Sequence, residues 1–174
     1  SLKTVHFSNR IPEIMADYMT VAHYTDEAIG KFVEYLRTRP EYGRTMVVIT
    51  GDHEGLADNR KDLCRTKAGK GIVSENEFTP FIVLNSPIAM YHTKVMGQVD
   101  IYTTLLNLLG LESYRWSGIG QSILDSGKPG VAISPKRSIE GDTMFLSREE
   151  LLRMRQSQVI SDRIIRFDKL KDLR

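Results

Sequence analysis

The sequence has little of several features that mark particular protein classes. It contains a single cysteine, Cys64, which excludes an internal disulfide framework. No run approaches the roughly 18 apolar residues of a membrane-spanning helix, and no charged-then-apolar leader opens the chain. The formal net charge is only +2, so charge gives no reason to expect a nucleic-acid partner, and we predict none. No internal repeat or low-complexity tract occurs.

What is present is an ordinary globular composition. The 174 residues are 41% hydrophobic and 26% charged, which suits one domain with a proper core. The chain lacks an initiator methionine and opens directly on a strand-like run, residues 2–7. We therefore expect an excised part of a longer protein. Within it we expect residues 1–124 to form the core and residues 125–174 to add strands and a final helix.

The first third of the chain has the order strand, helix, strand. Residues 2–7 are a plausible strand. Apolar residues then recur at three- and four-residue steps over about 12–38, which predicts a long helix. The β-branched run at residues 45–50 predicts a strand buried on both faces. This order is a βαβ unit, so we expect the two strands to be parallel.

The second of these strands stops at Gly51 and is followed at once by Asp52 and His53. In open α/β sheets ligands gather outside the carboxyl ends of the strands, and a carboxylate and an imidazole are both competent ligands for a divalent metal. A structural role is the alternative, because Gly-Asp is also a favourable turn sequence in which Asp bonds its own backbone. The order of elements around the motif has to decide between the two.

The middle of the chain predicts one irregular segment and two further elements. Residues 54–76 show no periodicity and follow the Asp-His pair, so we expect an active-site loop there. Residues 78–84 predict a strand, and residues 101–110 a helix. Asp100 is placed to cap that helix, and Gly110 to close it in a left-handed conformation.

The end of the chain gives weaker signals. Residues 130–134 and 143–146 could form an antiparallel pair. Ser147 and Glu150 make a capping box that opens a basic helix over about 148–170. We favour a solvated face for this helix over a membrane surface or a phosphate-rich partner, because acidic residues are interspersed among the basic ones.

Four features occur together in a fixed order, and each is weak alone. His6 is followed six residues later by a proline, the run YTDEAIGKF lies on the long helix, a strand ends in Gly-Asp-His, and residues 97–100 (GQVD) precede a Thr-Leu-Leu-rich helix. This combination resembles the alkaline phosphatase and sulfatase superfamily, and within it the lipoteichoic acid synthase branch of sulfatase-like proteins. The match covers roughly residues 6–124. It implies a three-layer α/β sandwich, a mostly parallel sheet flanked by helices, of which this chain is the C-terminal part.

The resemblance also implies roles for individual residues. Asp52 and His53 would be metal ligands. His6 matches a substrate-binding histidine near the transferred phosphate group, with a buried structural histidine as the alternative. Gln98 stands where two-metal members place another histidine ligand, so we expect one divalent cation. Mn²⁺ or Mg²⁺ is favoured over Zn²⁺ or Ca²⁺.

The implied activity is a metal-dependent phosphotransferase or hydrolase acting on phosphate esters of lipid- or polymer-linked substrates. The alternatives are a sulfuric ester hydrolase (sulfatase) and a catalytically incomplete module that binds an anionic polymer. In this superfamily the nucleophile lies in the N-terminal half of the catalytic domain, so we expect no catalytic nucleophile in this chain, no activity of the chain alone, and self-association through uncovered sheet edges. By the resemblance, the parent protein is membrane-anchored, with this domain outside the cytoplasm.

Overall fold

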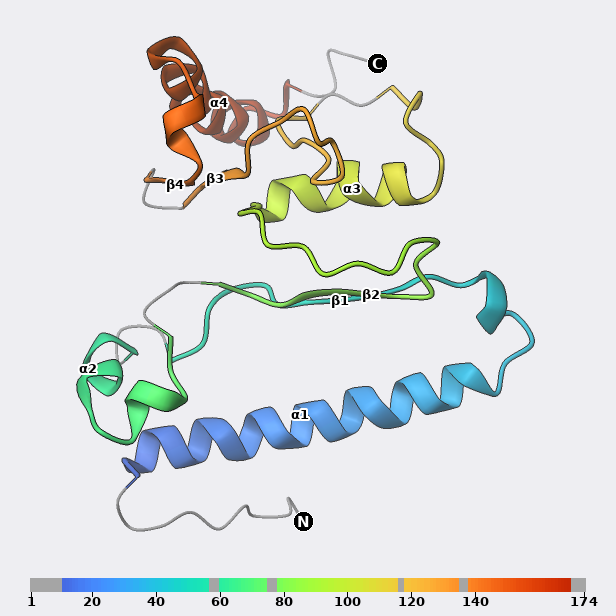
Figure 1. The fold of residues 1–174 in the computed structure, drawn as a ribbon, viewed down its shortest axis with the longest axis vertical. Coiled ribbons are helices and arrows are strands. Elements are labelled where there is room, and N and C mark those ends of the chain that lie inside the picture. Colours follow the sequence, from blue (N-terminus) through green and yellow to red (C-terminus); the bar gives the residue numbers. More distant parts are fainter. Residues whose placement is uncertain (1–10, 57–59, 75–77, 116–117, 135–137, 170–174) are drawn as a thin grey trace. The chain divides into compact units, whose positions relative to one another are not determined.

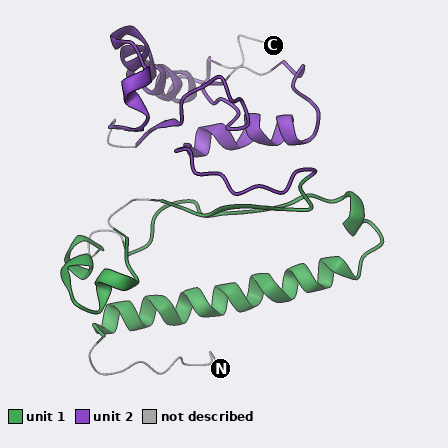
Figure 2. Cartoon of the chain, in the orientation of Figure 1, with its two compact units in different colours: residues 1–86 green, residues 87–174 purple. Residues whose placement is uncertain are grey.

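The protein forms two compact units, residues 1–86 and residues 87–174 (Figure 2). Figure 1 labels the helices and strands of both units in chain order. The predicted strand at residues 2–7, and with it His6, lies outside the residues that the structure describes. The computed structural model describes residues 11–56, 60–74, 78–115, 118–134 and 138–169.

Helix α1, Glu13–Arg37, is the longest element and confirms the predicted helix. Pro12 precedes it, where a missing N–H costs no helical hydrogen bond, and the Pro12 carbonyl accepts the backbone N–H groups of the first turn. Met15 and Val33 are buried along one side of the helix. Its large exposed apolar side chains are Ile14, Tyr18, Val21, Tyr24, Phe32 and Tyr35. Within the described residues, α1 therefore leaves a broad apolar surface uncovered.

Strands β1, Val47–Thr50, and β2, Phe81–Leu84, form an antiparallel two-stranded ladder. β1 confirms the predicted strand before the Asp-His pair, but not the burial of both its faces, because Val47–Ile49 are half-buried and Thr50 is exposed. β2 is shorter than the predicted strand 78–84, because Pro80 has no N–H to offer the ladder. The parallel pairing predicted for β1 involves residues 2–7, so it stays a prediction.

An asparagine secures the far end of this ladder. Asn85 adopts a left-handed conformation, φ 55°, which asparagine tolerates better than most residues. Its side-chain amide donates hydrogen bonds to the carbonyls of Tyr42, 2.9 Å, and Thr45, 3.0 Å. Tyr42 opens the short 3₁₀ helix η1, Tyr42–Arg44, between α1 and β1. The end of β2 is thereby tied to the segment that leads into β1.

The prediction of an irregular loop over 54–76 is wrong for part of that segment. Helix α2, Arg60–Arg65, and the 3₁₀ helix η3, Gly69–Gly71, lie within it. Leu63 and Cys64 are buried on α2. A six-residue helix has fewer than two turns, so its apolar residues cannot show the helical period in the sequence.

In the second unit, a 3₁₀ turn η4, Gln98–Asp100, leads into helix α3, Ile101–Leu108. The predicted closure of this helix is confirmed. Gly110 has φ +69°, and the N–H of Leu111 reaches back to the carbonyl of Leu106 at 2.8 Å.

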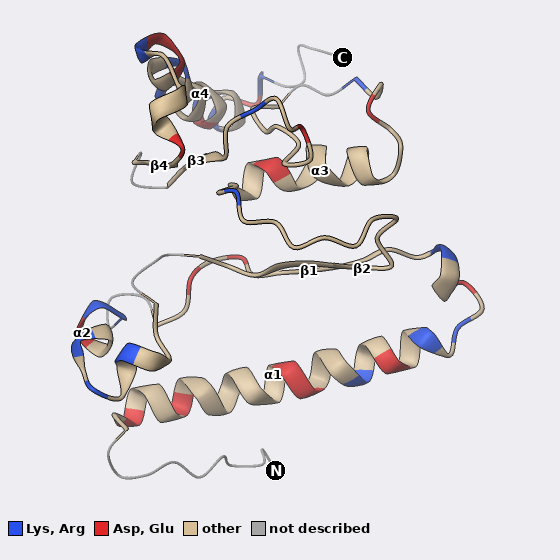
Figure 3. Ribbon diagram, viewed as in Figure 1, with Lys and Arg blue, Asp and Glu red and all other residues tan. Residues whose placement is uncertain are grey.

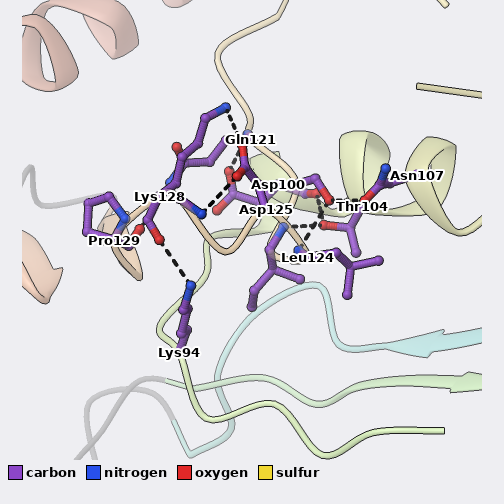
Figure 4. Close-up of polar contacts among 12 residues, drawn as sticks. Lys94, Asp100, Thr104, Asn107, Gln121, Leu124, Asp125, Lys128 and Pro129 are labelled. Atoms are coloured by element: carbon purple, nitrogen blue, oxygen red, sulfur yellow. Dashed lines mark hydrogen bonds and ion pairs between the residues drawn. The ribbon is translucent and has the colours of Figure 1, made fainter. Parts of the chain in front are cut away.

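Asp100 caps this helix in a different way from the one predicted. Its buried carboxylate accepts no hydrogen bond from the first turn of α3. One oxygen instead accepts the backbone N–H of Gly97 at 2.8 Å. The other accepts that of Gln121, also at 2.8 Å (Figure 4). Burial raises the pKa of Asp100, and the two N–H groups oppose that rise. The carboxylate thus joins the start of α3 to a segment that is distant in sequence.

Thr104 continues this connection from the next turn of α3. Its hydroxyl donates to the carbonyl of Asp100 at 2.7 Å and accepts the N–H of Ile123 at 3.2 Å. The hydroxyl of Ser122 donates to the side-chain oxygen of Asn107 at 3.1 Å. Thr104 is only 1% exposed, so the two hydrogen bonds of its hydroxyl are shielded from water. Residues 121–123 are therefore held to α3 by polar contacts.

The antiparallel pair predicted for the end of the chain exists, but its second strand was misplaced. Strand β3, Val131–Ile133, pairs with β4, Ile139–Gly141. The residues predicted as the second strand, 143–146, instead begin with a 3₁₀ turn, η5, at Thr143–Phe145. Gly141, the last residue of β4, has φ +99°, a conformation that glycine alone adopts without strain.

Helix α4, Arg148–Arg166, begins at the predicted capping box. The Ser147 hydroxyl accepts the N–H of Glu150 at 3.2 Å, and the Glu150 carboxylate accepts the N–H of Ser147 at 2.7 Å. Figure 3 shows acidic and basic residues interspersed along α4, and its arginines are exposed. Among the described residues, neither this helix nor any other combines the length and the apolar character needed to cross a bilayer.

We expect Asp100→Asn to destabilise the full chain by about 1–3 kcal/mol, because one of two shielded N–H groups would then face an amide N–H₂ instead of an oxygen. Asp100→Ala leaves both N–H groups without their acceptor and should cost more. Urea unfolding measures the difference. Asp125→Asn, at a more exposed carboxylate in the same unit, is the control and should change stability little. An unchanged midpoint for both Asp100 variants would contradict the assigned role.

The capping box predicts that the stability of the chain depends on pH in the acidic range. Hydrogen bonds from Ser147 lower the pKa of Glu150 below its ordinary value of 4.5. The folded state therefore gains stability from this carboxylate above pH 4.5 and loses it as the pH falls through the lower folded pKa. The difference in urea midpoint between the wild-type chain and Glu150→Gln should shrink over that range. A constant difference down to the lowest pH would show that the box does not act through the charged carboxylate.

Candidate metal centre

The Asp-His pair lies where the sequence placed it, directly after the carboxyl end of β1. The backbone N–H of Gly51 still bonds to the carbonyl of Pro80, at 3.4 Å, so the ladder extends to the residue before the pair. A side chain at Gly51 would press on Thr79, at 3.2 Å, which favours glycine there. Asp52 and His53 therefore project from a backbone that the β1–β2 ladder fixes.

A hydrogen bond to the backbone of the next residue sets the tautomer of the His53 ring. Its Nδ1 lies 2.8 Å from the backbone carbonyl oxygen of Glu54. A carbonyl oxygen only accepts, so Nδ1 must carry the proton, and in the neutral ring Nε2 then has a free lone pair. Metal-binding histidines commonly have this arrangement, in which the second ring nitrogen donates to a carbonyl or a carboxylate.

The Asp52 carboxylate lies next to that lone pair. Its Oδ1 is 3.8 Å from Nε2 of His53, and both side chains are largely exposed. The same Oδ1 accepts the backbone N–H of His53 at 3.0 Å. The pKa of His53 is raised, first by the hydrogen bond to the Glu54 carbonyl and second by the negative charge of Asp52. One carboxylate oxygen and one imidazole nitrogen thus lie 3.8 Å apart.

This spacing and this donor set fit a divalent cation. Two ligand atoms that each lie about 2.1 Å from one ion are separated by about 3–4 Å, which includes the distance found here. An oxygen and a nitrogen donor together suit Mn²⁺ and Zn²⁺, whereas Mg²⁺ and Ca²⁺ prefer oxygen. The bond from Asp52 to the next backbone N–H also satisfies the alternative role of this residue in a turn. The two roles are compatible, because a carboxylate oxygen has two lone pairs and can accept one N–H while it binds a cation.

The pair is incomplete as a metal site. In the described part of the chain, no three His, Cys, Asp or Glu side chains come together as a ligand cluster. His6, the predicted substrate-binding histidine, lies outside the described residues. Gln98 is exposed and belongs to the other unit. Since a firmly held cation needs about four ligands, further ligands would have to come from elsewhere.

The other described histidines have no such neighbours. His23 is exposed on α1. Nδ1 of His92 accepts the backbone N–H of Lys94 at 3.2 Å, so that ring is engaged in a local turn. Neither is part of a candidate site.

Two features of the loop after the Asp-His pair were not predicted from the sequence. Leu56 has φ +62°, a left-handed conformation that costs a non-glycine residue about 1–2 kcal/mol. A methyl group added to Gly55 would overlap the hydroxyl and ring of Tyr18 on α1. An isolated glycine can mark a close approach, but the sequence does not say which residue approaches it.

Comparison with known proteins identifies what this chain resembles. The Sulfatase family model matches residues 3–111. The chain is 23% identical over 159 residues to the lipoteichoic acid synthase-like protein YvgJ of Bacillus subtilis, a match that covers 86% of this chain and 26% of that protein. It is 25% identical over 130 residues to lipoteichoic acid synthase of Staphylococcus aureus, covering 71% of this chain and 20% of the relative. No solved structure gives a significant match.

Proposed function

Because this chain belongs to the sulfatase family, in the lipoteichoic acid synthase-like branch of the alkaline phosphatase and sulfatase superfamily, we propose that it forms part of a metal-dependent phosphotransferase or hydrolase. The substrates would be phosphate esters of lipid- or polymer-linked molecules. The family implies an alkaline-phosphatase-like α/β fold. The three-layer sandwich with a mostly parallel sheet is part of the proposal.

The observation that supports this function best is the donor pair after β1. The carboxylate of Asp52 and the Nε2 lone pair of His53 lie 3.8 Å apart at a strand end, outside the sheet. A divalent cation held there would supply positive charge to the oxygens of a phosphate group during transfer. Asp52 contributes negative charge and an anionic ligand, and the Glu54 carbonyl keeps the proton on Nδ1 so that Nε2 can bind.

The remaining parts of the catalytic domain would come from the rest of a longer protein. The chain spans about a quarter or less of the length of the relatives it matches. We propose that the nucleophile and at least one further acidic ligand lie in the N-terminal half of the domain. That half would also cover the exposed apolar surfaces of this chain. In its absence, these surfaces would lead the chain to self-associate. His6 is proposed to contact the substrate. The parent protein would be anchored in a membrane with this domain outside the cytoplasm.

A second candidate is a sulfuric ester hydrolase, which the description of the matching family favours. The two candidates differ in the group that is transferred. An aryl phosphate and an aryl sulfate, offered to the longer protein under the same conditions, distinguish them by which ester is cleaved.

In the longer protein, we expect Asp52→Ala and His53→Ala each to lower metal content and turnover by about 100-fold or more, since even the groups that orient metal ligands contribute about 10–100-fold. Metal content is measured by elemental analysis and turnover with the phosphate ester. Asp62→Ala and His23→Ala replace the same residue types at exposed positions of the same unit and serve as controls. Full turnover in the Asp52→Ala/His53→Ala double variant would refute the proposed centre.

The isolated 174-residue chain should bind Mn²⁺ or Zn²⁺ only weakly, because it offers two ligands where about four are needed. Calorimetric titration tests this expectation. Tight binding by the isolated chain would show that the ligand set is complete without the rest of the protein.

A further inference from the structure

We propose that Tyr18 of α1 is a positioning residue for His53. In this proposal, which rests on the metal centre proposed above, the Tyr18 ring packs on Gly55 and thereby holds the Glu54 carbonyl where it accepts the Nδ1 proton of His53. Tyr18 touches neither the cation nor the substrate. It acts through the loop that sets the tautomer of the metal-binding ring.

The contact between Tyr18 and Gly55 is close and selective. A methyl group built on Gly55 would overlap the Tyr18 hydroxyl, and its three nearest atoms would all belong to the Tyr18 side chain. Only glycine can therefore occupy this position while Tyr18 lies where it does. The contact joins the N-terminal part of α1 to the loop that follows β1.

The contact acts on the Glu54 carbonyl through the peptide bond. The carbonyl of Glu54 and the nitrogen of Gly55 belong to the same planar peptide unit, which also includes the Cα atom of Gly55. The Tyr18 side chain fills the space beside Gly55, so in this proposal it limits how far that peptide unit can rotate about the axis that joins the Cα atoms of Glu54 and Gly55, and with it the directions in which the carbonyl can point. The left-handed conformation of Leu56, φ +62°, indicates that the loop is held in a shape its own residues do not favour.

The direction of the Glu54 carbonyl decides what His53 presents to a cation. With Nδ1–H donating to it at 2.8 Å, the lone pair of the neutral ring is on Nε2, next to Asp52. If the carbonyl turned away, the ring could carry its proton on Nε2 instead and would then offer no lone pair beside the carboxylate. Tyr18 therefore controls the metal-binding form of His53 without touching it.

The first test reads the tautomer directly, without metal. Nitrogen NMR of the full chain, at a pH where the ring is neutral and with the His53 signal identified by its loss in His53→Asn, reports which ring nitrogen carries the proton. We expect the Nδ1–H form to predominate in the wild type and in Tyr18→Phe, which keeps the ring. Tyr18→Ala and Gly55→Ala should both give a mixture of tautomers.

Two matched variants control for general effects. Tyr24→Ala removes another exposed tyrosine of α1, about 120° around the helix from Tyr18. Gly30→Ala adds a methyl group to α1 where nothing lies within 4 Å. Both should leave the His53 tautomer unchanged. In the double variant Gly55→Ala/Tyr18→Ala the added methyl group meets no ring, so its tautomer mixture should match that of Tyr18→Ala alone.

The second test measures the metal. Broadening of the Asp52 and His53 signals by Mn²⁺ gives an apparent dissociation constant even for weak binding, which should rise about 10- to 100-fold in Tyr18→Ala and Gly55→Ala. Amide signals of α1, β1 and β2 report whether the unit that contains Tyr18 and Gly55 is folded in each variant. If Tyr18→Ala is not folded, Gly55→Ala carries the test.

The two readouts separate the two hypotheses. If the folded Tyr18→Ala and Gly55→Ala chains keep the wild-type tautomer and the wild-type Mn²⁺ affinity, the positioning role is refuted and the metal centre stands. If the tautomer changes as expected but the longer protein keeps its metal content and turnover when both Asp52 and His53 are replaced by alanine, the proposed metal centre is refuted, while Tyr18 still orients the ring.

Discussion

The hydrogen bond from Nδ1 of His53 to the Glu54 carbonyl is the interaction on which the candidate site depends. A neutral imidazole has one lone pair, and this bond assigns it to Nε2. Without the bond, Asp52 and His53 would be two exposed polar residues after a strand, as a turn alone would leave them. With it, Nε2 carries a lone pair and lies 3.8 Å from a carboxylate oxygen, a spacing that one cation can bridge.

The elements that the sequence predicts correctly are those specified by neighbouring residues. α1 follows from its apolar period, and the start of α4 follows from Ser147 and Glu150, which are three residues apart. The position of the Asp-His pair directly after a strand was also predicted correctly, because the strand ends where the β-branched run stops. In each case the information lies within one element and its ends, where local periodicity and capping chemistry determine the structure.

The features that the sequence does not reveal depend on residues that meet only in the folded chain. Asp100 reads as an ordinary helix cap, and nothing nearby indicates that its carboxylate binds Gln121. Likewise Gly55 gives no sign that its partner is Tyr18. The pairing of β3 with β4 was displaced because the apolar residues 143–146 suggest a strand more strongly than Ile139–Gly141, which contains a glycine. Which residues pair in a ladder depends on the partner strand, and neighbouring residues in the sequence do not specify that partner.

The arrangement of the loop after β1 also bears on how the exposed pair would bind the proposed cation. A free histidine ring samples two tautomers and many orientations, and ordering it on binding weakens affinity. Here the ring proton is already held by a backbone carbonyl, and the glycine that follows this carbonyl lies beside the Tyr18 side chain. Much of the ordering is therefore done during folding, before any ligand arrives. The same logic explains the left-handed Leu56, since the stability lost there is compensated by contacts elsewhere in the fold while the shape of the loop is kept for the site.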